Sequence, residues 1–150
     1  MQFKKPDTKL CSEAFTAVDT KRKSKLDAGE LVKAFEKMKL QFTQEEVTQL
    51  VQLITIQITQ IAISLEQFMH LIYICQNTSN KDTNRLLFLA ADSQYAGVID
   101  RRGVELILQR LGGNIKSQQT DDLMEAFTQD KNGKLTFEQF TDMMDILLGK

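Results

Sequence analysis

The feature that most constrains this chain is an internal repeat with a period of about 36 residues. Four segments share the order helix, polar loop, aliphatic residue, second helix, and they align on Leu26, Ile63, Ile99 and Leu135 at intervals of 37, 36 and 36 residues. A second apolar residue follows each of these by five positions, in the order Leu31, Phe68, Val104 and Phe140. A regular period of this length predicts four copies of one supersecondary unit.

The composition favours helices in these units. The chain has 150 residues, of which 42% are hydrophobic and 26% charged, as in globular proteins. A single proline and seven glycines leave room for long helices rather than the many turns of a sandwich or barrel. Cys11, Phe15 and Val18 recur at helical spacing on one face, and Thr43 with Glu46 predicts a capping box at the start of another helix.

The fourth copy, "AFTQDKNGKLTFEQF" at residues 126–140, resembles the EF-hand calcium loop, in which oxygen ligands alternate along twelve residues between two helices. By this resemblance the chain looks like calmodulin and its relatives over nearly its whole length, and residues 101–127 are similar to the link between the third and fourth hands of myosin light chains. The resemblance implies an all-α fold of four EF-hands in two paired lobes, with short two-stranded β ribbons between paired loops.

The implied domains are an N-terminal lobe at residues 1–75 with hands one and two, a linker at 76–85, and a C-terminal lobe at 86–150 with hands three and four. The linker "QNTSNKDTNR" has no apolar residue, which is typical of a connecting segment. We name the four twelve-residue loops by order: loop one at 19–30, loop two at 56–67, loop three at 92–103 and loop four at 128–139.

Loops one and two have lost the calcium chemistry. Loop one keeps Asp19, Asp27 and Glu30, but Lys21 and Lys23 replace ligands, and an ammonium only donates hydrogen bonds. We therefore expect ion pairs between its carboxylates and its lysines. Loop two replaces its ligands with side chains that carry no carboxylate: Ile56, Ile58, Gln60 and Gln67.

Isoleucines alternate with polar residues in loop two, and this pattern also fits a freestanding edge strand. That strand is the alternative to a loop that pairs with loop one. The resemblance instead predicts that Ala62–Ser64 pairs with Lys25–Asp27. Ile61 stands where the family has glycine at positive φ, which is costly for a β-branched residue, so the loop must depart from the usual geometry.

Loop three keeps Asp92, but Gly103 replaces the final glutamate, and we expect no binding there. Loop four is the best remnant, although Asp130 is the one carboxylate among its ligand positions. Its candidates for weak calcium binding are Thr128, Asp130, Asn132, Lys134, Thr136 and Gln139. Because affinity falls with the number of charged ligands, no tightly bound cofactor is expected, and weak calcium binding at loop four is the alternative.

The resemblance implies a function that survives the loss of calcium, because paired EF-hands enclose an apolar groove for an amphipathic helix. Methionines favour such adaptable grooves. The predicted groove residues of the C-terminal lobe are Phe88, Leu108, Leu111, Met124, Met143, Met144, Leu147 and Leu148. The expected function is a calcium-independent light chain or adaptor for an IQ-type helix of a partner such as a myosin heavy chain, and the alternative is a calcium sensor acting through loop four. Simple core packing is a competing explanation for the groove residues, above all for Phe88.

Other classes of function have little support. The single histidine, His70, has no nucleophile or phosphate loop to work with, so catalysis is not expected. The basic run "KRKSK" at residues 21–25 stands in a chain of net charge −1, which disfavours nucleic acid as a partner. No apolar run is long enough for a membrane span, and two distant cysteines, Cys11 and Cys75, fit a reducing compartment. We therefore expect a cytoplasmic protein associated with the cytoskeleton.

Overall fold

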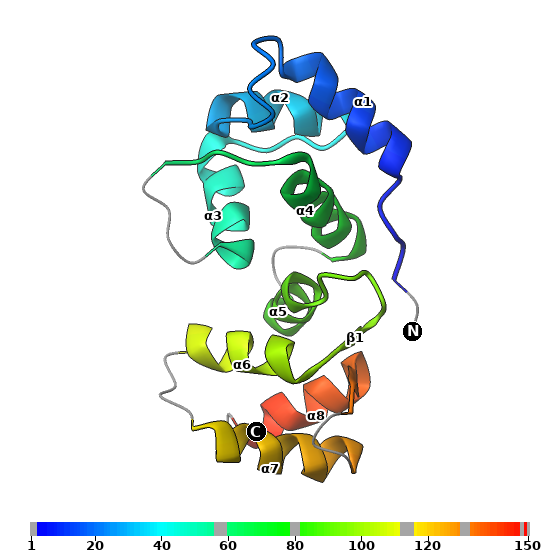
Figure 1. Ribbon diagram of the computed structural model, residues 1–150, viewed down its shortest axis with the longest axis vertical. Helices are drawn as coiled ribbons and strands as arrows, with labels where there is room; N and C mark the ends of the chain where they lie inside the picture. The colour runs from blue at the N-terminus through cyan, green and yellow to red at the C-terminus, as the bar shows by residue number, and fades with distance from the viewer. Residues whose placement is uncertain are drawn as a thin grey trace. The chain divides into compact units, whose positions relative to one another are not determined.

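The structure is a computed structural model, and it describes residues 3–55, 60–78, 82–111, 116–129, 133–147 and 149. Within these residues the chain is mostly helical, with eight helices and one two-stranded antiparallel sheet (Figure 1). The prediction of an all-α fold with a short β ribbon is thereby confirmed at this level. None of the described helices combines the length and apolar character needed to cross a membrane.

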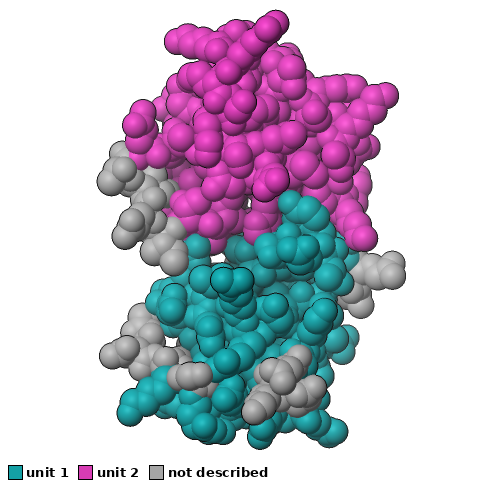
Figure 2. Space-filling model, in the orientation of Figure 1, with its two compact units in different colours: residues 1–3, 78–150 teal, residues 4–77 magenta. Residues whose placement is uncertain are grey.

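The chain folds as two compact units, coloured separately in Figure 2. Unit 2 consists of Lys4–Asn77, and unit 1 consists of Met1–Phe3 together with Thr78–Lys150. Of the predicted linker at 76–85, residues 76–77 belong to helix α4, and Thr83–Arg85 belong to helix α5. Helix α5 begins this early because the Asp82 side chain caps it by accepting a hydrogen bond from the Arg85 backbone N–H at 3.1 Å.

Unit 2 contains helices whose starts are fixed by side-chain caps. They are α1 (Thr8–Val18), α2 (Ala28–Lys37), α3 (Gln44–Ile54) and α4 (Leu65–Asn77). Asp27 and Glu30 form a reciprocal capping box on α2, and Thr43 and Glu46 form the predicted box on α3. The apolar faces meet around Phe68, whose ring centroid lies 6.2 Å from that of Phe15 and 5.6 Å from that of Phe35.

One β-bridge joins the two loops of unit 2. Leu26 and Ile63 exchange two backbone hydrogen bonds, each of 2.9 Å, in antiparallel pairing. Both side chains are buried in the core of the unit. This confirms the predicted pairing of the second loop with the first, and it disfavours the alternative of a freestanding strand.

Asn77 fastens the end of α4 to the amino-terminal segment of unit 2. Its amide oxygen accepts from the Lys4 backbone N–H at 2.7 Å, and its amide nitrogen donates to the carbonyls of Lys4 and Tyr73, each at 2.8 Å. One side chain thus ties together two segments that are 73 residues apart.

Unit 1 repeats the arrangement of helices and paired loops. It contains α5 (Thr83–Ala91), β1 (Val98–Ile99), α6 (Arg101–Arg110), α7 (Ser117–Thr128), β2 (Leu135–Thr136) and α8 (Phe137–Leu147). In the sheet, Val98 pairs with Thr136 and Ile99 with Leu135. The repeat positions Leu26, Ile63, Ile99 and Leu135 are therefore the pairing points of both units.

An aromatic residue from the start of the chain completes the core of unit 1. The Phe3 ring lies 5.8 Å from that of Phe88 and 5.9 Å from that of Phe137, and Phe88 and Phe137 meet edge to face at 5.3 Å. The Arg85 guanidinium lies over the Phe3 and Phe137 rings at 5.8 and 5.4 Å from their centroids.

We predict that Phe3→Ala lowers the free energy of unfolding of unit 1 by about 1–3 kcal/mol, because a partly buried ring with two aromatic neighbours is lost. Urea denaturation of the full chain, followed by NMR signals of residues in α5 and α8, measures the change. Phe3→Leu is the matched control and should retain most of the stability. An unchanged urea midpoint for Phe3→Ala would show that this packing contributes nothing.

Both cysteines are predicted to be unreactive in the folded protein. Burial raises the pKa of Cys11 to about 11, with the Asp7 carboxylate adding to the shift, and burial alone raises the pKa of Cys75 to about 12. At pH 8 only about one thiol in a thousand or fewer is then a thiolate. Ellman's reagent should label neither cysteine in native buffer and both in denaturant, with the single variants Cys11→Ala and Cys75→Ala assigning each signal.

The raised pKa values of the two thiols also make the stability of the folded protein depend on pH. The folded thiols hold their protons above the ordinary pKa of 9.0, whereas the unfolded thiols lose theirs. The free energy of unfolding should therefore fall as the pH rises from about 9 towards 11. Rapid labelling in native buffer, or a stability independent of pH in this window, would contradict the burial argument.

Candidate functional site

Loop one is held by its own hydrogen bonds. The two carboxylate oxygens of Asp19 accept from the backbone N–H groups of Lys23 and Ser24, each at 2.9 Å. Ser24, the sixth residue of the loop, has a φ of 61°. The loop therefore keeps its turn although no glycine stands there.

The far end of loop one is closed by an ion pair. The Lys23 ammonium lies 3.2 Å from Glu30 Oε1, which also accepts the Asp27 backbone N–H at 3.0 Å. The predicted pairing of lysine with carboxylate is confirmed for Lys23 and Glu30. Lys21 is exposed, and the described residues offer it no ion-pair partner.

Loop one does not fit a calcium ion. Lys21 and Lys23 stand at two of the ligand positions, and the Lys23 ammonium brings its own positive charge to Glu30 at the last one. Calcium needs six to eight oxygens, and a lysine supplies none from its side chain. We therefore derive no role for calcium at this loop.

Loop two is described from Gln60 onward, so the predicted positions Ile56 and Ile58 lie outside the described residues. Gln60 is exposed, whereas Ile61 packs against the core of unit 2. Ile61 is not among the described residues with positive φ, so the loop departs from the usual backbone at this point, as predicted. Gln67 Oε1 accepts the Ser64 backbone N–H at 3.0 Å, which uses the last loop position as a helix cap.

Loop three combines a buried carboxylate with a missing glutamate. Asp92 is only 2% exposed, and its two oxygens accept from the N–H groups of Ala96 and Gly97, each at 2.9 Å. At Gly103 an added Cβ would lie 3.2 Å from Ile99 Cβ and 3.3 Å from Ala91 Cβ. The space for a twelfth-position side chain is thus filled by core packing.

Loop four is closed by an amide where the family has a carboxylate. Gln139 Oε1 accepts the Thr136 backbone N–H at 2.9 Å, and Gln139 Nε2 donates to the Phe127 carbonyl at 3.0 Å. The Thr128 hydroxyl donates to the Met124 carbonyl at 2.7 Å. Lys134 is exposed. The predicted positions Asp130 and Asn132 lie outside the described residues, and the described part of the chain contains no cluster of three or more acidic, cysteine or histidine ligands for a metal ion.

No protein-family model matches the chain. A probable calcium-binding protein, CML13 of Oryza sativa subsp. japonica, is 25% identical over 134 residues, covering 88% of this chain and 78% of that protein. The calcium-binding protein CML19 of Arabidopsis thaliana is 23% identical over 133 residues, covering 88% and 79% respectively. The chain is thus similar to calmodulin-like proteins of the EF-hand superfamily.

One solved structure similar to this chain is a homolog of programmed cell death 6 protein from Leishmania major Friedlin. It is 21% identical, and the alignment covers 94% of this chain and 77% of that chain with a TM-score of 0.41.

The predicted partner-groove residues divide into buried and exposed groups. Phe88, Leu108, Met124, Met143 and Met144 are between 0 and 3% exposed. Leu111 and Leu147 are 46% and 41% exposed, and the side chain of Leu148 is not described. A helix could reach the buried group only if the helices of unit 1 moved apart. Their groove role stays a prediction.

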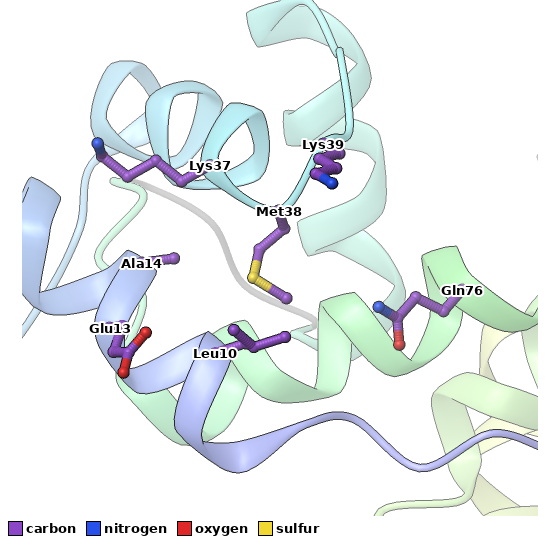
Figure 3. Close-up of a pocket in the computed structure, with 7 residues that line it drawn as sticks. All are labelled: Leu10, Glu13, Ala14, Lys37, Met38, Lys39 and Gln76. Atoms are coloured by element: carbon purple, nitrogen blue, oxygen red, sulfur yellow. The ribbon is translucent and has the colours of Figure 1, made fainter.

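Unit 2 instead contains an open groove, which the sequence did not predict (Figure 3). It has a volume of about 450 Å³ and is lined by Leu10, Glu13, Ala14, Lys37, Met38, Lys39 and Gln76. Figure 3 shows the Met38 side chain directed towards Leu10 between the helices. Leu10 is 52% exposed, although it stands in the first turn of α1 next to the core residue Cys11. In the sequence, an apolar residue beside the core-facing positions of α1 was the signal that could have indicated this groove.

We predict that replacing the two loop-one lysines restores a calcium site. The change Lys21→Asp with Lys23→Asp removes two ammonium groups, frees Glu30 and completes the alternating carboxylates of an EF-hand loop. Calorimetry of the metal-free variant should detect one calcium ion bound with a Kd of about 1 mM or below, with wild type as the baseline.

The matched control is Lys5→Asp with Lys9→Asp, which changes the net charge equally outside the loop. If the loop variant binds no better than this control, the lysines are not what excludes calcium.

Proposed function

We propose that this chain is a calmodulin-like adaptor, built of four EF-hands in two paired lobes, that holds an amphipathic helix of a partner protein without calcium control. The observation that carries this proposal is the groove of unit 2, with an exposed leucine on its floor. Amphipathic helices bind by placing an apolar stripe into grooves of this kind.

The bonding of loop one supports independence from calcium. In calcium sensors of this superfamily, binding of the ion opens a pair of helices. Here the Lys23–Glu30 ion pair and the two N–H bonds to Asp19 fix loop one between α1 and α2. The helices that border the groove are then held by groups that belong to the protein itself.

The first partner class to test is an IQ-type helix of a myosin heavy chain, in a cytoplasmic, cytoskeletal setting. The resemblance of residues 101–127 to myosin light chains favours this class. Acidic side chains of unit 1 are available for the basic residues of such a helix: Asp121, Asp122, Glu125, Asp142 and Asp145. Asp121 is already paired with Arg101 at 3.0 Å, so the other four are the stronger candidates.

The second candidate function is a weak calcium sensor acting through loop four. The names of the two plant relatives as calcium-binding proteins favour it. Calcium titration of the metal-free wild-type chain decides between the two, because a sensor should bind calcium and change its helix affinity with it.

We predict that the full chain binds an amphipathic helical peptide with an uncharged polar face equally well in chelator and in calcium. Fluorescence anisotropy with a labelled peptide measures the Kd, and an IQ-type peptide run alongside tests the myosin class. Leu10→Ser should weaken binding about threefold to tenfold, because about 1 kcal/mol of apolar burial is lost.

Leu106→Ser is the matched control, since Leu106 is a similarly exposed leucine outside this groove. Binding that appears only with calcium would favour the sensor function instead.

A further inference from the structure

The groove of unit 2 is flanked by two cations. Lys37 is the last residue of α2, and Lys39 follows two positions later; they lie on either side of Met38 in Figure 3. Both lysines are exposed, and neither has an ion-pair partner among the residues that the structure describes. Glu13 is the one carboxylate among the described lining residues, and no ion pair joins it to either lysine.

The chain segment around the groove also carries a net positive charge. Residues 4–39 contain ten Lys and Arg against six Asp and Glu, a formal charge of +4, whereas residues 40–77 carry no Lys or Arg and three Glu, a charge of −3. The groove lies mainly on the positive segment, since six of its seven lining residues fall between positions 10 and 39.

The positive character continues beyond the groove along α2. Lys37 also borders a second hollow, which Lys21, Lys23 and Lys33 line as well. Three acidic residues border that hollow too, but only Glu30 among them is close enough to a lysine to form an ion pair within the described residues. An anionic partner that extends from the groove over this hollow would therefore meet the ammonium groups of Lys21 and Lys33, beside the carboxylates of Asp27 and Glu36.

The floor of the groove specifies an amphipathic occupant. Leu10, Ala14 and Met38 provide an apolar surface between the polar rims. Gln76 adds an uncharged polar side chain to the lining.

We propose that the groove of unit 2 selects an amphipathic helix whose polar face is acidic: its apolar stripe covers Leu10 and Met38, and its Asp or Glu side chains pair with Lys37 and Lys39. This rests on the proposed function, and it assigns the chemistry of the partner at that site. A basic helix of the IQ type is repelled at this groove by the same two lysines.

The test uses the full-length chain in chelator and three labelled helical peptides. The peptides share one Leu and Met stripe and differ only in the polar face, which is Glu-rich, Gln-rich or Lys-rich. We expect the Glu-rich peptide to bind about tenfold more tightly than the Lys-rich peptide at about 50 mM salt, and this difference to shrink at about 500 mM salt. Vesicles of phosphatidylserine and phosphatidylcholine form a fourth arm.

The variant Lys37→Glu with Lys39→Glu should reverse the order of the Glu-rich and Lys-rich peptides. Arg22→Glu with Lys25→Glu makes the same change in net charge at residues that line neither hollow, and it should leave the order unchanged. Circular dichroism and the urea midpoint establish that both variants are folded.

Four outcomes would overturn the proposal. Tighter binding of the Lys-rich peptide, or equal effects of the two double variants, refutes the acidic partner while leaving helix binding intact. Binding of none of the three peptides refutes the proposed function together with this inference. Binding to the anionic vesicles alone would assign the lysines to a membrane surface instead.

Discussion

The structure depends on the backbone pairing between the loops of each unit. In unit 2, Leu26 and Ile63 exchange two hydrogen bonds of 2.9 Å, and in unit 1, Ile99 pairs with Leu135. All four side chains are buried, so each pairing point also joins its loop to the core. Two helix–loop–helix segments that each expose an apolar face become one folded unit in this way.

Side-chain hydrogen bonds of the protein itself hold the ends of three of the loops. The last position of loops one, two and four forms a helix cap: Glu30 with Asp27, Gln67 with Ser64, and Gln139 with Thr136. Lys23 adds a positive charge to the first of these, and the Gln139 amide joins loop four to Phe127. These bonds join each loop end to its helix through groups that belong to the chain itself.

The comparison of sequence and structure is informative residue by residue. The spacing of the repeat led directly to the pairing of Leu26 with Ile63, and the Thr43–Glu46 box was visible as a local motif. The groove of unit 2, in contrast, could not be predicted from the sequence. Its lining joins Leu10 to Gln76 across 66 positions, and whether a leucine in an amphipathic helix is covered or exposed depends on which helices pack beside it.

By itself the sequence determined the repeat, the helix caps and the loss of calcium ligands, because these depend on residue type and on spacings of a few positions along the chain. Only the tertiary structure decided which lysine of loop one pairs with Glu30, that Phe3 completes the core around Phe88, and that the space beside Gly103 is already occupied. These contacts depend on the packing of segments that are not adjacent in sequence. A pattern in one segment does not specify the distance to another.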